Sequence, residues 1–226
     1  MPSRETNSNL LVIVPAFNEQ DCIGEVLSQI PNWVDVVVIN DGSSDNTKEI
    51  CLLHDKLVLS HEVNKGYEEA LITGVGFFMS SSYTQFVVID ADGEIDVANA
   101  LALLSAVSKE QPLFCGYRTA YKGRVAERIV GRITDRFFGV KDLYCGCKGF
   151  HRSIVVEHTP EQICDGIFTK FVLKKSLVSN IVNVPIGGIA RKGTSRFGSG
   201  ITINLRLFGN FILSVITLIT ERKLNQ

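Results

Sequence analysis

The sequence predicts an α/β fold in which helices flank a mostly parallel sheet. Three observations predict it. Short apolar runs rich in β-branched residues recur along the N-terminal half, each run ends in a polar loop, and stretches with helical spacing separate the runs. Alternation of strand, loop and helix is typical of a parallel sheet with right-handed crossovers. In such sheets ligands bind beyond the carboxyl ends of the strands.

The elements follow from apolar periodicity, taken in chain order. Ser44 or Asp45 is expected to cap the second helix, since short polar side chains accept hydrogen bonds from first-turn amides. We expect strands at 10–14, 33–39, 57–60, 86–89 and 113–117, and helices at 21–30, at 47–54 and from Tyr67 to Phe77.

Three carboxylates follow the strand at 86–89 at alternate positions: Asp90, Asp92 and Glu94. Negative charges at the mouth of a buried strand repel one another and are costly to bury unpaired. Mg²⁺ or Mn²⁺ would relieve that cost, because both ions favour carboxylate oxygens. An ordinary polar turn is the alternative, since Asp-Gly is a common turn dipeptide. The two interpretations are evenly balanced on this stretch alone.

Bulk properties set limits on the function. A chain of 226 residues suits one large domain, or one domain and a tail, and a formal net charge of −1 does not indicate a nucleic-acid partner. Six cysteines are scattered without a zinc spacing, so we expect them to be reduced and the protein to be cytoplasmic. Residues 1–9 form a polar tail without the apolar stretch of a secretion signal.

The loop after the first strand argues against two common nucleotide sites. It reads Pro15-Ala16-Phe17-Asn18-Glu19, where a dinucleotide-binding domain would carry Gly-x-Gly-x-x-Gly. A Walker loop is also missing from the sequence. Acidic groups with a metal instead suit a phosphate-bearing ligand that arrives with its cation.

Four motifs in order resemble family 2 glycosyltransferases, and more narrowly the branch that makes dolichyl- or polyprenyl-phosphate sugars. They are 15–19, Asn40-Asp41-Gly42-Ser43-Ser44-Asp45, Asn64-Lys65-Gly66-Tyr67 and Asp90-Ala91-Asp92. Later segments at 142–150, 184–186 and 191–196 resemble that branch as well. The resemblance covers about residues 10–197, and linked motifs are more specific than any single one.

The resemblance implies a GT-A, Rossmann-like fold and an inverting, metal-dependent transfer of sugar. The donor would be a nucleoside-diphosphate sugar, and the acceptor a polyprenyl phosphate or a glycan precursor. Phe17 stands where the family often has Tyr, which loses a hydroxyl but keeps stacking. By resemblance the nucleotide sugar contacts Pro15, Phe17, Glu19, Ile39, Asp41, Asp90 and Ala91, and the metal binds Asp90, Asp92 and Glu94.

The region from Gly116 to Lys141 is unusually basic. Arginines spaced by four from Arg124 to Arg136 share one helical face, and Arg118 ends a strand at the active edge. They suit a track for a lipid phosphate or the sugar diphosphate, because the arginine fork binds phosphate oxygens bidentately. Arg118 and Arg128 are the favoured contacts. The alternative is a solvated face paired with nearby acids.

A later loop is expected, by resemblance, to close over the diphosphate after the donor binds. Arg191 and Ser195 lie in it, and glycines provide the freedom that closure needs. The alternative is a mobile surface loop. The expected catalytic residues are Asp92, Arg118 and Arg191.

Two departures from the family pattern leave alternatives open. Glu68 stands where a glycine is usual, and the segment 165–172 lacks the glutamate often found in relatives, which leaves the catalytic base undefined. A phosphate acceptor would need no strong base, whereas a sugar hydroxyl would need a nearby carboxylate. The alternatives to a glycosyltransferase are a non-catalytic nucleotide-sugar binding module and a sugar-nucleotide pyrophosphorylase.

The C-terminal segment 198–226 is expected to form a separate apolar helix after a transferase domain at 10–197. Residues 201–220 are strongly apolar but are interrupted by Asn204, Arg206 and Asn210. The continuous part is too short to span a bilayer, which takes about 20 residues. An amphipathic helix on a membrane surface or in a homo-oligomer is one interpretation, and a helix docked on the core is the other.

Overall fold

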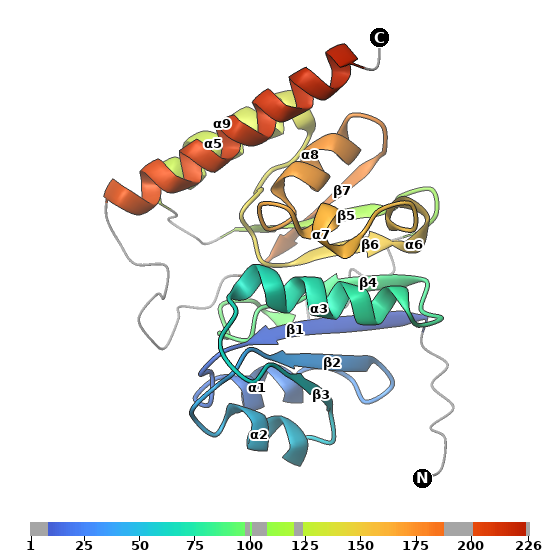
Figure 1. The fold of residues 1–226 in the computed structure, drawn as a ribbon, viewed down its shortest axis with the longest axis vertical. Helices are drawn as coiled ribbons and strands as arrows, with labels where there is room; N and C mark the ends of the chain where they lie inside the picture. The colour runs from blue at the N-terminus through green and yellow to red at the C-terminus, as the bar shows by residue number, and fades with distance from the viewer. Residues whose placement is uncertain (1–8, 98–99, 101–107, 120–123, 188–200, 225–226) are drawn as a thin grey trace.

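The computed structural model describes residues 9–97, 100, 108–119, 124–187 and 201–224. Within them, seven strands form one mixed sheet in the order β3-β2-β1-β4-β6-β5-β7. Helices cover both faces of the sheet, and the long C-terminal helix lies across one end of the molecule (Figure 1). The predicted α/β class is confirmed.

The N-terminal half alternates strand and helix as predicted. β1, β2, β3 and β4 pair in parallel, so their carboxyl ends share one edge. The helix predicted at 21–30 is shorter, and Asn46 precedes α2, although the Asp45 carboxylate accepts the Thr47 N–H at 3.0 Å. The elements are β1 Leu10–Ala16, α1 Ile23–Ser28, β2 Asp35–Asn40, α2 Thr47–Leu53, β3 Leu57–Ser60, α3 Tyr67–Met79 and β4 Gln85–Val88.

The C-terminal half makes the sheet mixed. β6 runs antiparallel to both β4 and β5, while β7 pairs in parallel with β5. The elements are β5 Leu113–Arg118, α5 Val125–Phe138, β6 Lys148–His151, α6 Arg152–Val155, α7 Pro160–Cys164, α8 Thr169–Ser176, β7 Ile181–Ile186 and α9 Ile201–Leu224. β6 lies next to β4 in the sheet and runs in the opposite direction. The loop that precedes β6 therefore lies beside the loop that follows β4.

A chain of buried aromatic rings joins the two halves. Phe86 lies 4.7 Å from Phe78 and 5.1 Å from Phe150, and Phe150 lies 5.1 Å from Phe168, centroid to centroid. These side chains come from β4, α3, β6 and the turn before α8, and all four are buried. Aromatic pairs at such distances add stabilisation beyond area burial.

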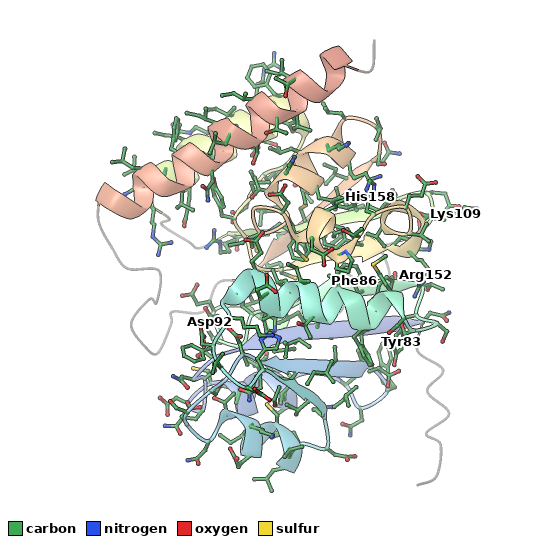
Figure 2. All side chains as sticks on the ribbon, viewed as in Figure 1. Tyr83, Phe86, Asp92, Lys109, Arg152 and His158 are labelled. Atoms are coloured by element: carbon green, nitrogen blue, oxygen red, sulfur yellow. The ribbon has the colours of Figure 1, made fainter. Side chains whose placement is uncertain are left out.

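The two ends of the sheet differ in character (Figure 2). At the amino end of β4, Arg152 donates to the carbonyls of Phe78 and Ser81, each at 2.9 Å, and so satisfies the last turn of α3. Asp92 lies at the opposite end, beyond the carboxyl ends of the parallel strands. The polar loops predicted to carry function therefore gather away from this structural contact.

The helix α9 docks on the core. Phe211 and Leu218 are buried in the same apolar cluster as α3 and α8 residues, and α9 packs along α5 and α8. Tyr144 donates to the Leu207 carbonyl at 2.7 Å, and the Ala126 N–H donates to Asn204 at 3.0 Å. The inner face of α9 is therefore docked on the core, which is the second of the two interpretations offered for this helix. Among the described helices, none has the length and apolarity to cross a bilayer.

Candidate active site

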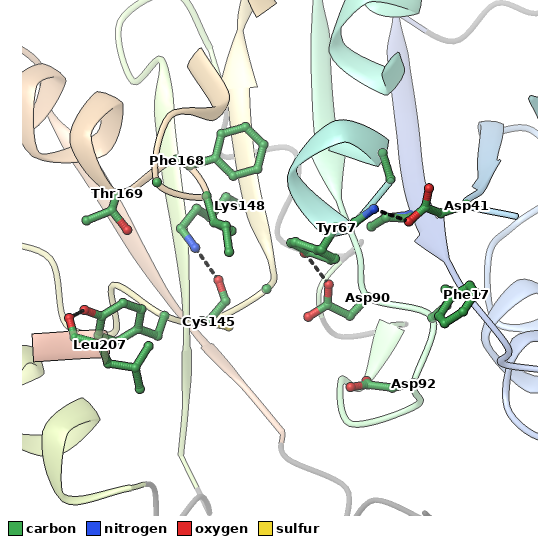
Figure 3. Close-up of a pocket in the computed structure, with 18 of the residues that line it drawn as sticks. Phe17, Asp41, Tyr67, Asp90, Asp92, Cys145, Lys148, Phe168, Thr169 and Leu207 are labelled. Atoms are coloured by element: carbon green, nitrogen blue, oxygen red, sulfur yellow. Dashed lines mark hydrogen bonds between the residues drawn. The ribbon is translucent and has the colours of Figure 1, made fainter. Parts of the chain in front are cut away.

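A cavity of about 410 Å³ lies at the carboxyl edge of the parallel strands. The loops after β1, β2 and β4 form one side, and the loop before β6, the turn before α8 and the inner face of α9 form the other (Figure 3). Residues predicted from the sequence that line it are Pro15, Phe17, Glu19, Asp41, Asp90, Ala91 and Asp92. Segments distant in sequence therefore meet, as the parallel-sheet argument requires.

The Asp90 carboxylate is held in a defined position. Its Oδ1 accepts a hydrogen bond from the Tyr67 hydroxyl at 2.6 Å. Its Oδ2 faces Gly146, where an added Cβ would lie 1.7 Å from that oxygen, so only glycine fits there. Burial, followed by the charge of Asp92, raises the pKa of Asp90 to about 6, against the opposing effects of the Tyr67 hydrogen bond and the Lys148 charge.

Asp92 is more open to ligands. It is half-buried, lines the cavity, and its Oδ1 accepts the Glu94 N–H at 3.0 Å, which fixes the turn. Within the described ranges, no three His, Cys, Asp or Glu side chains gather to hold a metal ion, and Glu94 is not among the cavity-lining residues. Two carboxylates are nevertheless a fitting donor set for Mg²⁺, which is usually bound through one or two carboxylates plus substrate phosphates.

Asp41 organises the loop that precedes α3. Its Oδ1 accepts the Lys65 N–H at 2.9 Å and lies 2.7 Å from His61 Nδ1, and its Oδ2 accepts the Gly66 N–H at 2.8 Å. The other ring nitrogen of His61 lies 2.9 Å from the Thr73 hydroxyl. Asp41 is 2 % exposed, and both of its carboxylate oxygens already contact protein groups. Few acceptor positions therefore remain for the predicted contact with a nucleotide base.

Hydrogen bonds from backbone N–H groups to side-chain oxygens tie the first loop to the second loop and to the start of α2. The Asn18 N–H donates to Ser43 at 3.0 Å, the Ser44 N–H donates to Asn18 at 2.8 Å, and the Glu19 N–H donates to Thr47 at 2.8 Å. These contacts leave the Phe17 and Glu19 side chains facing the cavity. Ile39, in contrast, is fully buried in the core beneath α3 and is not brought to the cavity.

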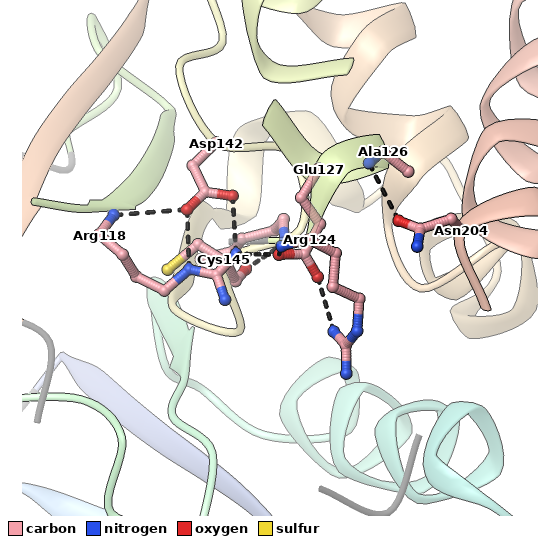
Figure 4. Close-up of polar contacts among 8 residues, drawn as sticks. Arg118, Arg124, Ala126, Glu127, Asp142, Cys145 and Asn204 are labelled. Atoms are coloured by element: carbon pink, nitrogen blue, oxygen red, sulfur yellow. Dashed lines mark hydrogen bonds and ion pairs between the residues drawn. The ribbon is translucent and has the colours of Figure 1, made fainter. Parts of the chain in front are cut away.

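The arginines divide into paired and exposed groups, and Figure 4 shows two paired ones, Arg118 and Arg124. Arg118 donates to Asp142 through Nε at 2.8 Å and through Nη2 at 3.1 Å, and it does not line the cavity. Arg124 lines the cavity and donates to Glu127 at 2.7 Å. Arg128 is exposed on α5, outside the cavity lining. Of the predicted basic track, only Arg124 among the described residues reaches the site.

Comparison with known proteins decides the family. Residues 11–159 match the model described as glycosyl transferase family 2. The chain belongs to this family. An N-acetylglucosaminyltransferase of Methanococcus voltae, named as acting from UDP-N-acetylglucosamine on dolichyl phosphate, is 23% identical over 90% of this chain and 95% of that protein. Dolichol-phosphate mannosyltransferase of Pyrococcus furiosus is 27% identical over 82% of this chain and 58% of that protein.

Other relatives match over a shorter range. The chain spans about half the length of several uncharacterized relatives, such as a Methanocaldococcus jannaschii protein that is 32% identical over 53% of this chain and 48% of its own length. Among solved structures, glucosyl-3-phosphoglycerate synthase of Mycobacterium tuberculosis with Mn²⁺ and UDP-glucose has a TM-score of 0.71 at 18% identity, covering 92% of this chain and 79% of that one. That likeness confirms the GT-A fold.

Two residues that the family resemblance made candidates lie outside the described residues. Arg191 and Ser195 fall within 188–200, so their predicted roles at the diphosphate stay predictions. The structural evidence for this family 2 glycosyltransferase therefore rests on the loops after β1, β2 and β4 and on the opposite wall.

Sequence reasoning missed that opposite wall. Tyr67 and Lys148 stood inside motifs that were recognised, but neither was assigned a role. A lysine at the start of an apolar run, as in Lys148-Gly149-Phe150, is the one signal that would have singled out Lys148, because buried lysines are rare unless paired. The other unpredicted lining residues include Tyr144, Gly146, Phe168, Thr169, Leu207 and Asn210.

Proposed function

We propose that this chain is a metal-dependent, inverting glycosyltransferase that moves a sugar from a nucleoside-diphosphate sugar to a polyprenyl phosphate. The observation that carries the proposal is the cavity in which Phe17 and Glu19, from the loop after β1, meet the Asp90–Asp92 pair from the loop after β4. A base and ribose beside Phe17 would leave the diphosphate facing the two aspartates. Family membership favours this reaction over that of a pyrophosphorylase.

Asp90 and Asp92 are the residues that would hold Mg²⁺ or Mn²⁺, with Glu94 as a further candidate ligand. The ion, when bound, supplies positive charge against the charge that develops on the leaving nucleoside diphosphate. The similar glucosyl-3-phosphoglycerate synthase has been solved with Mn²⁺ or Mg²⁺ and UDP, which supports the same pairing here. Arg191 is proposed to assist at the diphosphate.

The acceptor side of the cavity suits a lipid phosphate. Leu143, Ile167, Phe168 and Leu207 give it an apolar lining, and Arg124 adds a positive charge at its border. The Methanococcus voltae relative, which matches nearly the whole chain, is named for a dolichyl-phosphate acceptor. A glycan precursor is the second acceptor class, and it would leave this apolar lining unused.

A phosphate acceptor also accounts for the missing base. Asp165 is exposed, pairs with Lys170 at 3.1 Å and does not line the cavity, while Glu127 is bound to Arg124. A phosphate oxygen is already an anion near neutral pH. It forms the bond to the anomeric carbon from one face as the bond to the diphosphate breaks on the other, and no proton has to be removed.

The outer face of α9 is proposed to contact the membrane that carries the acceptor. Leu205, Leu213, Ile216 and Ile219 are each at least half exposed there. The exposed arginines of α5, which packs beside α9, suit anionic headgroups. Flotation with vesicles containing anionic lipid tests this contact, and Leu213→Asp should reduce the bound fraction. A homodimer that buries the same face and does not float would contradict it.

The activity test measures release of nucleoside diphosphate and formation of glycolipid. The protein is incubated with Mn²⁺, a polyprenyl phosphate and each of UDP-glucose, UDP-N-acetylglucosamine and GDP-mannose, with Asp92→Ala as control. We expect one donor to give both products in the wild type and neither in the variant. Donor binding without turnover would favour the non-catalytic binding module. Formation of a nucleoside triphosphate when pyrophosphate is added would favour the pyrophosphorylase.

A further inference from the structure

Lys148 is a buried lysine whose ammonium has spare donors. It begins β6, is 2 % exposed, and lines the cavity. Its ammonium donates to the Cys145 carbonyl, and it makes no other hydrogen bond or ion pair within the described part of the chain. An ammonium offers three donors, and leaving a buried charge without full pairing is costly. The cavity is the place where a ligand would complete its coordination.

Thr169 presents a second polar group at the same wall. The residue is 2 % exposed, it lines the cavity, and its hydroxyl forms no hydrogen bond to the described residues. It begins α8 directly after Ile167 and Phe168, which have φ values of 58° and 64°. Left-handed backbone at such bulky residues is strained and is concentrated at functional sites. The turn therefore holds Thr169 at the cavity at an energetic cost.

The position of these two groups relative to the nucleotide loops indicates what they would contact. Figure 3 shows Phe17 and Asp92 on one side of Asp90, with Lys148 and Thr169 on the other. A donor whose base lies at Phe17 and whose diphosphate lies at Asp92 would extend its sugar past Asp90 toward this wall. An ammonium, a hydroxyl and a carboxylate together provide the donors and acceptors that sugar hydroxyls need.

We infer that Lys148 and Thr169 form the subsite that recognises hydroxyl groups of the transferred sugar. The inference rests on the proposed function and adds to it the residues that select the sugar. Both side chains donate to sugar oxygens, and Thr169 also accepts. A site built to hydrogen-bond a hydroxyl discriminates strongly against a ligand that lacks it, because its own polar groups are then left unpaired.

Calorimetric titration of the full chain with Mn²⁺ tests the inference. UDP is compared with UDP-glucose and UDP-N-acetylglucosamine, and GDP with GDP-mannose. For the preferred donor, we expect Thr169→Val and Lys148→Met each to lower the affinity for the nucleotide sugar relative to its parent diphosphate by roughly tenfold. In Thr169→Val, affinity for the diphosphate itself should stay unchanged. Thr169→Val should also leave the Tm nearly unchanged, since the hydroxyl that it removes faces the cavity and makes no hydrogen bond to the described residues.

Thr134→Val is the matched control. Thr134 is also buried, but its hydroxyl donates to the Val140 carbonyl at 2.6 Å, so this change should lower the Tm. The ratio of the affinity for the nucleotide sugar to the affinity for the diphosphate should stay as in the wild type. An unchanged ratio in Thr169→Val, or an equal loss for both ligands, would overturn the assignment while leaving the proposed function intact. Failure of the wild type to bind any of the five nucleotides would overturn both. If Lys148→Met does not fold, Thr169→Val alone decides.

Discussion

The hydroxyl of Tyr67 donates a 2.6 Å hydrogen bond to Oδ1 of Asp90. Tyr67 is the first residue of α3, and Asp90 follows β4, so the contact ties the start of a helix to the acidic loop. The loop before α3 is in turn fixed by Asp41 through the Lys65 and Gly66 amides. The orientation of the Asp90 carboxylate thus depends on loops after two different strands.

Removing the Tyr67 hydroxyl should weaken cation binding. Tyr67→Phe keeps the ring but releases Asp90 Oδ1, and loss of a residue that orients a metal ligand typically costs about 10–100-fold in metal affinity. Titration of Mn²⁺ in the presence of nucleoside diphosphate measures the effect. Tyr83→Phe is the control, because it also removes a tyrosine hydroxyl, but at the other end of the sheet and outside the cavity lining. Equal Mn²⁺ affinities in the two variants would contradict the role of Tyr67.

A side chain at position 146 should displace Asp90. In Gly146→Ala the new Cβ would lie 1.7 Å from Oδ2, far inside contact distance, so the carboxylate must move. We expect Mn²⁺-dependent nucleotide binding to fall by at least about tenfold, measured by calorimetry. Gly76→Ala is the matched control, because a Cβ at position 76 would lie 3.9 Å from its nearest neighbour. This substitution should stabilise α3 by up to about 1 kcal/mol without changing nucleotide binding.

Cation binding should depend on pH through Asp90. Its pKa is raised from 3.8 to about 6, so the ion-free native state binds this proton more tightly than the unfolded state and loses stability as pH rises between those values. A cation binds the ionised form and competes with the proton, so its affinity should rise with pH through about 6 and then level off. Thermal shifts with Mn²⁺ from pH 5 to pH 8 measure it. Asp90→Asn should remove this dependence, and a flat wild-type profile would contradict it.

Docking of α9 should contribute to the stability of the whole domain. Leu218→Ala empties a buried position in the core cluster and should lower the free energy of unfolding by about 2–5 kcal/mol. Leu213→Ala removes the same atoms from a side chain that is 63 % exposed, and its effect should stay within about 0.5 kcal/mol. Urea denaturation compares the two. Similar small effects would show that α9 does not belong to the cooperative core.

The sequence predicted the features that depend on local patterns. Apolar runs such as 10–14 and 86–89 locate parallel strands because a strand buried on both faces needs continuous apolar residues. The same rule places the loops after those strands at one edge, which is why Phe17, Asp41 and Asp92 were found together. The family followed from the motifs in those loops, and the match over 11–159 confirms it.

Contacts between distant segments were beyond such reasoning. Arg118 pairs with Asp142, 24 residues away, and no periodicity reports that a strand-end arginine will meet this carboxylate instead of a ligand. The reversed direction of β6 brings Lys148 to the cavity, and a single apolar run does not reveal strand direction. Ile39 was expected at the base pocket, but its alternation in β2 points it into the core under α3.

The most direct test of the account is calorimetric titration of UDP and GDP into the wild type and Asp92→Ala, each with and without Mn²⁺. We predict that the wild type binds one of the two diphosphates, that Mn²⁺ strengthens this binding, and that the strengthening is lost in Asp92→Ala. Binding that is the same with and without Mn²⁺, or a cation effect that survives in the variant, would contradict the claim that the acidic loop holds a cation against the diphosphate.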